Sequence, residues 1–187
     1  MENVKESFLN IRQSTPQDIP AIRNLHLSAF PKEEREVVAK LAVNLISEPT
    51  EPETLSLVAE TDGGDLAGHV VFSPVWIDNR NEIAGYILAP IGVNPEVQKQ
   101  GIGSALIRQG LEWLATEGVH LVFVYGDPAY YGRYGFDAGT AVNYQPKFEL
   151  EFPFGWQALV LDPKGETGPD QPVTITFVSA LQDPGLW

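Results

Sequence analysis

The sequence predicts a mixed α/β fold (α+β) with one mostly antiparallel sheet and helices on both faces. Two observations predict it. Strand-like and helix-like segments follow each other in the order β-α-α-β-β-β-α-β-α-β, which matches neither a doubly wound parallel sheet nor an antiparallel sandwich. Consecutive strands joined by short turns are expected to pair antiparallel. A length of 187 residues is typical of one domain, so we expect residues 1–187 to form a single domain.

The first strand is expected at Phe8–Ser14 and is followed by two helices. Thr15-Pro16-Gln17-Asp18 has the features of a helix start, with Thr as N-cap, Pro in the first turn and Asp three residues after the cap. Pro31 ends the first helix, and the second is expected at Glu33–Ser47. Apolar residues recur at helical spacing: Ile19, Ile22, Leu25 and Ala29 in the first, and Val37, Val38, Leu41 and Leu45 in the second.

Three strands joined by two tight turns follow the second helix. The turns are Asp62–Asp65 and Asp78–Asn81, both composed of residues that favour reversal of the chain. The strands are rich in apolar and β-branched residues, and they are predicted at Leu55–Glu60, Leu66–Ile77 and Glu82–Val93.

Helices and strands alternate in the rest of the chain. A helix is predicted at Gly101–Glu117, with Trp113 on its core side and Gly118 in the position that commonly ends helices. The elements that follow are a strand at His120–Tyr125, a short helix at Pro128–Tyr134, and strands at Gln157–Leu161 and Val173–Val178. The other tryptophans, Trp76, Trp156 and Trp187, are expected in the core or in an interface.

Composition excludes several classes of function. Lys and Arg total 12 and Asp and Glu total 25, so the formal charge is −13. Such a chain repels nucleic-acid backbones and favours a cationic partner, although acidity can also serve solubility alone. No apolar run is long enough to span a bilayer, and the N-terminus has no signal-peptide pattern. With no cysteine there is no disulfide, thiolate metal site or catalytic thiol, which fits a cytoplasmic location, and we expect no metal.

The strongest local signal is a glycine-containing turn placed directly before a helix. Strand residues up to Val93 are followed by Asn94-Pro95-Glu96-Val97-Gln98-Lys99-Gln100-Gly101-Ile102-Gly103-Ser104. Free backbone N–H groups and the helix dipole favour an anion at this kind of helix start. Glycines at 101 and 103 would let a phosphate approach the backbone closely. The segment therefore predicts a phosphate-binding turn.

Three phosphate-binding motifs compete for this segment. A P-loop requires Gly-Lys-Ser/Thr after four intervening residues, and that pattern is absent. A dinucleotide fingerprint requires a third glycine where the chain has Leu106, and a strand that leads directly into the first glycine. The pattern that fits is Gln-x-x-Gly-x-Gly, formed by Gln98, Gly101 and Gly103.

This segment resembles the acetyl-coenzyme A site of the GNAT superfamily of N-acetyltransferases, and within it a bacterial group of poorly characterised members. A second block supports the resemblance, because Gly126–Phe136 contains the Tyr-x-x-x-Gly-Phe element of that family. The resemblance covers about residues 10–138, and the C-terminal extension 139–187 has two strands but no recognised motif. It implies that the pantetheine arm lies on a splayed strand at Ile91, Gly92 and Val93. It also implies that the pyrophosphate lies on Gln98, Lys99, Gln100, Gly101, Ile102, Gly103 and Ser104.

The same resemblance implies a catalytic tyrosine. Tyr131 matches the tyrosine that many family members use to protonate the departing thiolate, and a phenol is protonated at neutral pH. The alternative is that Tyr131 only packs beneath the cofactor. Tyr130 and Tyr134 are the weaker candidates for the acid. Pro90, which has no N–H, is expected at an edge or a bulge of its strand.

No residue stands out as the general base. Glu82 lies on a strand that bears such a glutamate in some family members, and Glu33 and Glu34 lie near the loop that borders the acceptor site in the family. The histidines, His26, His69 and His120, fit structural roles in helix or strand patterns, and of these His69 on a central strand is the one worth testing.

We therefore expect an enzyme that transfers an acetyl group from acetyl-coenzyme A to a primary amine, directly and in a ternary complex. The amine belongs to a small molecule or a peptide, no nucleic acid or membrane is involved, and a homodimer stays open. One alternative is a non-catalytic module that binds acyl-coenzyme A as a sensor or scaffold. A nucleotide-binding oxidoreductase is a second alternative, which the missing third glycine disfavours.

Overall fold

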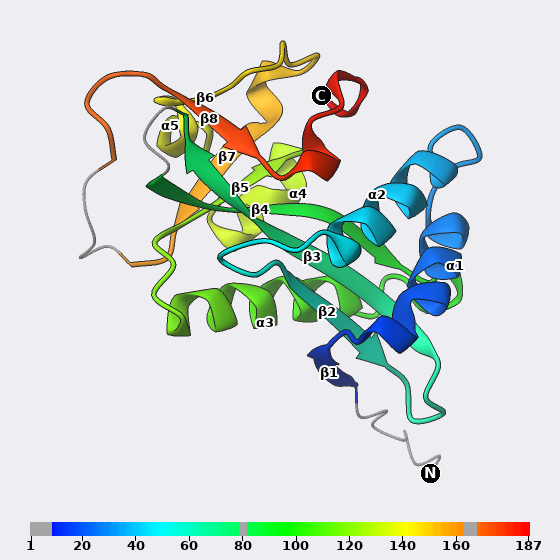
Figure 1. Ribbon diagram of the computed structural model, residues 1–187. Coiled ribbons are helices and arrows are strands. Elements are labelled where there is room, and N and C mark those ends of the chain that lie inside the picture. The colour runs from blue at the N-terminus through cyan, green and yellow to red at the C-terminus, as the bar shows by residue number, and fades with distance from the viewer. Residues whose placement is uncertain (1–8, 79–81, 163–167) are drawn as a thin grey trace.

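A computed structural model describes residues 9–78, 82–162 and 168–187. Phe8 and residues 79–81 of the second predicted turn lie outside the described residues. The described strands form an eight-stranded sheet in which β1, β2, β3, β4, β5 and β7 lie in that order (Figure 1). The strands are β1 (Asn10–Gln13), β2 (Leu55–Glu60), β3 (Leu66–Ile77), β4 (Glu82–Val93), β5 (Leu121–Tyr125), β6 (Tyr144–Pro146), β7 (Trp156–Val160) and β8 (Val173–Phe177).

Strand pairing confirms a mixed, mostly antiparallel sheet. The hairpin pairs β2–β3 and β3–β4 are antiparallel, as are β1–β2, β5–β7 and β3–β8. Only two of the described pairs are parallel, β4–β5 and β6–β8. Because β8 pairs with β3, the end of the chain joins the same sheet as its beginning.

The sheet has long helices on both faces, as the sequence predicts. The helices α1 (Ile19–Ala29) and α2 (Arg35–Ser47) cover one face, and α3 (Ile102–Thr116) covers the other (Figure 1). Two short helices, α4 (Pro128–Tyr131) and α5 (Ala138–Ala141), follow β5. Within the described ranges, no helix has the length and apolar character required to cross a membrane.

The core beneath α3 depends on two glycines that allow the helix to approach the sheet. A Cβ on Gly110 would lie 2.2 Å from a ring carbon of Phe72 on β3, and a Cβ on Gly68 would lie 2.8 Å from a methyl group of Leu106. These contacts are closer than real side chains allow. The backbone of α3 at Gly110 therefore packs directly on the Phe72 ring, and the backbone of β3 at Gly68 packs directly on the Leu106 methyl group. The start of α3 is thereby held beside the end of β4.

The face that α2 presents to the core differs from the predicted one. Leu45 is buried as expected, but Val37 is 51% exposed, and Ala39 and Ala42 are buried with Leu45. The prediction for Val37 was wrong because small residues, rather than the larger valines, let α2 lie close to its neighbours. Helical periodicity alone does not distinguish these two faces when both carry apolar residues.

The C-terminal residues complete the sheet and add an aromatic cluster. The two strands predicted there are present as β7 and β8. Trp187 stacks on Phe177 with ring centroids 4.6 Å apart, and Trp156 stacks on Phe123 at 5.2 Å. These tryptophans therefore belong to the core of this face. The described strands of this region, β6, β7 and β8, thus belong to the same sheet as the rest of the molecule.

Candidate active site

The strand β4 separates from β5 at the point where its apolar run is interrupted. The two strands pair only at Tyr86, Ile87 and Leu88 of β4. On the other edge, Val70 of β3 pairs with Ile91 and Phe72 pairs with Leu88, so β4 contains a bulge that includes Pro90. The expected bulge is thus confirmed. Past Leu88, β4 has no pairing with β5 among the described residues.

The turn after β4 has the backbone shape of an anion cradle. Lys99 has φ +62° and Gly101 has φ +85°, so two residues of this turn are left-handed. Lysine rarely adopts that conformation, which costs about 1 kcal/mol or more and is commonly found at functional sites. Successive amides in such turns point into one concavity, and the amides of the first turn of α3 have no helical partner. The turn therefore offers several free N–H groups at one place.

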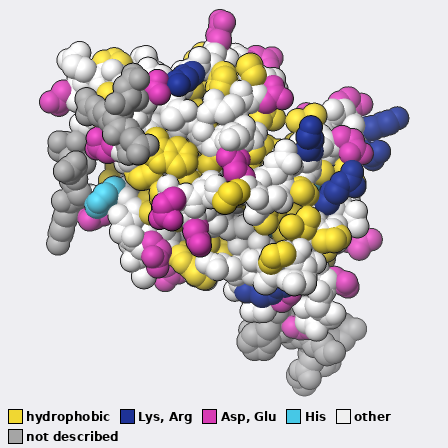
Figure 2. All heavy atoms as spheres, in the orientation of Figure 1, with side chains coloured by type: hydrophobic (Ala, Val, Ile, Leu, Met, Phe, Trp, Pro, Cys, Tyr) yellow, Lys and Arg dark blue, Asp and Glu magenta, His cyan; other side chains and the backbone are white. Residues whose placement is uncertain are grey.

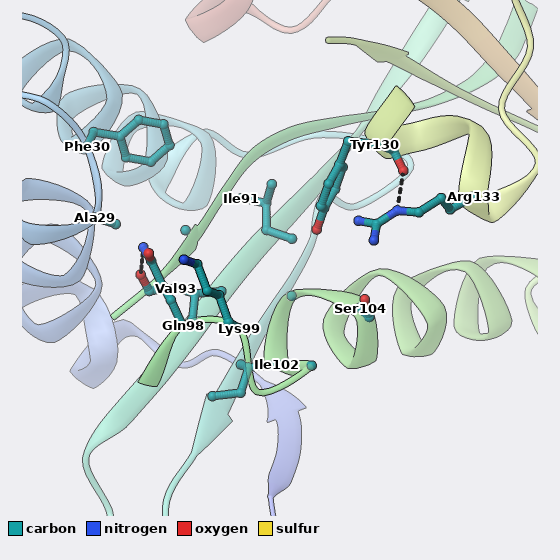
Figure 3. A pocket seen from close by; sticks show the side chains of 13 residues that line it. Ala29, Phe30, Ile91, Val93, Gln98, Lys99, Ile102, Ser104, Tyr130 and Arg133 are labelled. Carbon is teal, nitrogen blue, oxygen red and sulfur yellow. Dashed lines mark hydrogen bonds between the residues drawn. The ribbon is translucent and has the colours of Figure 1, made fainter. Parts of the chain in front are cut away.

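The splayed strand and the turn line one cavity of about 660 Å³ (Figure 3). Of the residues predicted to bind the cofactor, Gln100 alone does not line it. Four further residues complete its wall. The lining residues are Ala29, Phe30, Ile91, Gly92, Val93, Gln98, Lys99, Gly101, Ile102, Gly103, Ser104, Tyr130 and Arg133.

Side-chain hydrogen bonds hold the parts of this cavity together. The Nε2 group of Gln98 donates to the carbonyl of Val93 at 3.1 Å, which ties the turn to the end of β4. Ser104 and Tyr134 share a hydrogen bond between their hydroxyl groups at 2.7 Å, which ties α3 to the segment after β5. Gln98 and Ser104 therefore position the wall of the cavity from both sides.

Two cationic side chains reach the cavity from opposite sides (Figure 3). Lys99 extends from the turn. Arg133 lies 4.5 Å from the centre of the Tyr130 ring, and its Nε donates to the carbonyl of Tyr130 at 3.1 Å. Sequence reasoning missed Arg133. The available signal was an arginine within the Tyr-x-x-x-Gly-Phe block of an otherwise acidic chain.

The tyrosines of this block have different environments. Tyr130 lines the cavity, and its hydroxyl lies 3.2 Å from the position of a Cβ on Gly103, beside the start of α3. The predicted acid, Tyr131, does not line the cavity, and it packs its ring against Gly126 and Phe136, directly after β5. Burial raises the pKa of Tyr131 to about 12. Burial, and then a hydrogen bond with Tyr134, also raise the pKa of Tyr130, so both phenols are protonated at neutral pH.

The sequence of the chain matches known acetyltransferases over the part that builds this cavity. The profile of the acetyltransferase (GNAT) family matches residues 19–136. The chain belongs to this GNAT family. The chain is 34% identical to an uncharacterised N-acetyltransferase of Escherichia coli strain K12, YjhQ, over 70% of this chain and 75% of that protein. It is 37% identical to the uncharacterised N-acetyltransferase YhbS of the same strain, over 68% and 72% of the two chains.

Solved structures of GNAT acetyltransferases share the fold. The crystal structure of YhbS from Escherichia coli in complex with CoA superposes with a TM-score of 0.77 at 27% identity, covering 93% of each chain. A GNAT-family acetyltransferase from Brucella melitensis in complex with acetyl-CoA superposes with a TM-score of 0.65 at 31% identity, covering 94% of this chain and 99% of that one. The expected fold and enzyme class are therefore confirmed.

None of the candidate bases of this acetyltransferase lines the cavity. Glu82 begins β4, nine residues before Ile91, and at about 3.3 Å per residue it lies near the opposite end of the strand. Glu33 and Glu34 are exposed between α1 and α2. Among the described residues that line the cavity, none carries a carboxylate or an imidazole.

The histidines differ from one another more than the sequence suggested. His120 is 57% exposed and lies 3.8 Å from Asp162, so the structural role expected for it was wrong. His26 and His69 are buried, and they hydrogen-bond to each other across 2.8 Å. One nitrogen of His26, Nδ1, is buried without a hydrogen-bond partner among the described residues.

Proposed function

We propose that this protein transfers an acetyl group from acetyl-coenzyme A to a primary amine, by direct attack in a ternary complex. The observation that carries the proposal is the shape of one cavity, which joins an unpaired strand edge to a cradle of free amides. That shape suits a long ligand with a peptide-like arm and an anionic end. Two relatives with the same fold were crystallised with CoA and with acetyl-CoA, which supports the assignment.

The residues present fit each part of this substrate. The free edge of β4 at Ile91–Val93 can pair with the amides of the pantetheine arm, as an added strand would. The amides at Gly101–Ser104 suit the pyrophosphate. Lys99 and Arg133 supply positive charge on either side of it, in a chain whose formal charge is −13.

The same assignment specifies how each step of the acetyl transfer would occur. Acetyl-coenzyme A supplies the acyl group as a thioester. The neutral amine attacks the carbonyl carbon, the bond from carbon to sulfur breaks, and the amine proton passes to water, since none of the described lining residues is a base. A backbone N–H of the splayed strand stabilises the charge on the carbonyl oxygen. Tyr131 protonates the leaving thiolate.

Tyr131 suits the acid role better than Tyr130 does. The hydroxyl of Tyr130 lies beside Gly103 and 3.5 Å from the hydroxyl of Tyr134, at the phosphate end of the cavity. Tyr131 packs at Gly126, which follows β5, where the gap between β4 and β5 opens.

A thiol-release assay with acetyl-coenzyme A and a panel of amines tests the function. We expect steady turnover with at least one small-molecule or peptide amine, and no turnover with the panel members whose amine is blocked. Tight binding of acetyl-coenzyme A without turnover of any amine would instead establish the sensor or scaffold alternative.

The charge of the protein predicts the kind of amine that reacts best. Figure 2 shows acidic side chains over much of the visible face, while Lys and Arg gather mainly over α1 and α2. A negative field accelerates association with cations, and salt screens it over about 8 Å at physiological ionic strength. We therefore expect kcat/KM for the best amine to fall as salt is added. If kcat/KM did not change with salt, the acidic residues would serve solubility alone and would not attract the substrate.

A further inference from the structure

Four polar side chains, three of them buried, form a hydrogen-bonded row across the sheet, and none of them has a part in the proposed reaction so far. His26 on α1 and His69 on β3 are joined through Nε2 and Nδ1 at 2.8 Å. The Nε2 of His69 lies 2.9 Å from the hydroxyl of Ser56 on β2, and Ser14, just after β1, donates its hydroxyl to Ser56 at 2.6 Å. Both imidazoles are fully buried. We call these residues the imidazole row.

The tautomer of each ring follows once the direction of the bond between Ser56 and His69 is assigned. Ser56 accepts from Ser14, and we assign its own proton to the bond with Nε2 of His69. With Nε2 accepting, a neutral His69 carries its proton on Nδ1 and donates it to Nε2 of His26. A neutral His26 must then carry its proton on Nδ1. The row therefore ends in an N–H group at His26.

This terminal N–H group lies against the wall of the cavity. Nδ1 of His26 is buried without a partner in the part of the chain that the structure describes. A Cβ on Gly92 would lie 2.9 Å from it, and the ring of Phe30 stacks on the His26 ring at 5.8 Å. Both Gly92 and Phe30 line the cavity. A buried unpaired donor costs about 1–3 kcal/mol, which a ligand oxygen at this place would recover.

We propose that His26 donates its Nδ1 proton to a carbonyl oxygen of the acyl-pantetheine arm when acetyl-coenzyme A is bound. The inference rests on the proposed function, because it takes Gly92 to lie beside that arm. The backbone of Gly92, which has no side chain, and the ring of Phe30 separate Nδ1 from the cavity. His69, Ser56 and Ser14 are positioning residues, which keep the proton on the nitrogen that faces the ligand.

The low basicity of both rings supports a role as a neutral donor. Burial lowers the pKa of His26 to about 4 and that of His69 well below its usual value. Neither ring is therefore charged at neutral pH. A charged donor would be harder to bury, and it would break the direction of the row, because both nitrogens of each ring would then be donors.

Nuclear magnetic resonance of 15N-histidine-labelled protein tests the proposal directly, since the chain has three histidines. At pH 7 we expect His26 and His69 as neutral Nδ1–H tautomers. Saturation with coenzyme A, or with an inert analogue of acetyl-coenzyme A, should shift the Nδ1 proton resonance of His26 downfield. The resonances of His120, which does not line the cavity, should not change. An Nε2–H tautomer at His26, or no shift of His26 at saturation, overturns the proposal.

Two ligands distinguish the two possible carbonyls. Coenzyme A itself has the pantetheine amides but no acyl carbonyl. A carba analogue of acetyl-coenzyme A, with CH2 in place of the thioester sulfur, has both and cannot transfer the acetyl group. A shift with coenzyme A assigns the acceptor to a pantetheine amide, and a shift with the analogue alone assigns it to the acyl carbonyl. Calorimetry keeps the failures apart: absence of binding refutes the proposed function, and binding without a shift refutes only this inference.

Two variants check the donor and the row. His26→Phe keeps the stack on Phe30 but removes the donor, and we expect about a tenfold loss of coenzyme A affinity or of kcat, according to which carbonyl is bound. His120→Phe, the matched control, should change neither. Ser56→Ala removes the donor to His69, so the Nε2–H form should become detectable in both rings. Wild-type affinity and rate in a folded His26→Phe protein would overturn the proposal.

Discussion

At the residue scale, a side chain at position 103 would be tightly confined in the wall of the cavity beside α3. A Cβ there would lie 3.2 Å from the hydroxyl of Tyr130 and 3.6 Å from a methyl group of Val93. We expect Gly103→Val to weaken acetyl-coenzyme A binding at least tenfold, about 1.4 kcal/mol, because its methyl groups occupy the place of the phosphates. Gly103→Ala should have a smaller effect, since the Tyr130 side chain can shift. Unchanged affinity by calorimetry in a folded Gly103→Val protein would remove the cofactor from this turn.

Tyr131 and Tyr130 allow a matched comparison. Tyr131→Phe keeps the ring that packs on Gly126, so affinity for coenzyme A should change little. The single-turnover rate should fall by roughly 10²- to 10⁴-fold if proton transfer to sulfur is lost. Tyr130→Phe should instead act mainly on cofactor affinity, because its hydroxyl lies at the phosphate end. Full single-turnover activity of Tyr131→Phe would exclude the acid role.

Arg133 is expected to bind a phosphate group of the cofactor. A hydrogen bond to a charged group contributes about 1.5–3 kcal/mol, so Arg133→Gln should weaken coenzyme A binding roughly tenfold or more. Arg108→Gln is the control, because Arg108 lies over the ring of Tyr134 but does not line the cavity. Calorimetry with coenzyme A and with 3′-dephospho-coenzyme A identifies the phosphate that Arg133 contacts. Equal affinity of wild type and Arg133→Gln for both ligands would contradict the assignment.

At the scale of elements, the position of α3 is determined where it meets β3. The helix bears the amides that we assign to the pyrophosphate, and its distance from the sheet depends on Gly68 and Gly110. Glycine within a helix is destabilising by about 1 kcal/mol relative to alanine, so packing must compensate at position 110. The ring of Phe72 occupies the space that this glycine leaves.

Gly110→Ala should therefore destabilise the protein although alanine favours helices. Its Cβ would meet ring carbons of Phe72 at 2.2 and 2.5 Å, and overpacking of this kind typically costs about 1–3 kcal/mol. Urea unfolding measures the change. Glu112→Ala, at an exposed position of the same helix, is the control and should stay within about 0.5 kcal/mol of wild type. A Gly110→Ala protein more stable than wild type would contradict this prediction and would show that the Phe72 ring can move to accommodate the methyl group.

At the scale of the whole molecule, the free energy of unfolding should decrease as the pH is lowered, because of the buried imidazoles. The pKa of His26 is lowered from 6.5 to about 4 by burial, and that of His69 is lowered too. Between these values the unfolded chain binds more protons than the folded one, so stability is fully present above pH 6.5 and is lost as pH falls toward 4. The shift at His26 alone corresponds to about 3 kcal/mol.

Urea unfolding at several pH values between 7 and 4.5 measures this loss. The carboxyl groups of Asp18, Glu48 and Glu60 also have lowered pKa values, but their stabilisation is lost only at still lower pH. His26→Phe should make the free energy of unfolding depend less on pH between 7 and 4.5, whereas His120→Phe should leave this dependence unchanged. A flat stability between pH 6.5 and 4.5 in the wild type would contradict a buried, neutral pair.

The sequence by itself determined the features that depend on neighbouring residues. The order of strands and helices follows from hydrophobic periodicity, and the left-handed turn before α3 follows from a glycine placed before a helix. The bulge at Pro90 follows from the missing N–H of proline. Each of these signals lies within a few residues of the feature that it predicts.

The tertiary structure alone decided which distant residues meet. Arg133 and Lys99 face one cavity from different elements, and His26 bonds to His69, which is 43 residues away. The buried side of α2 was decided in the same way, because neighbouring elements select Ala39 and Ala42 over Val37. Such contacts depend on how elements pack in space, and packing between distant segments leaves no periodic pattern in the chain from which it could be predicted.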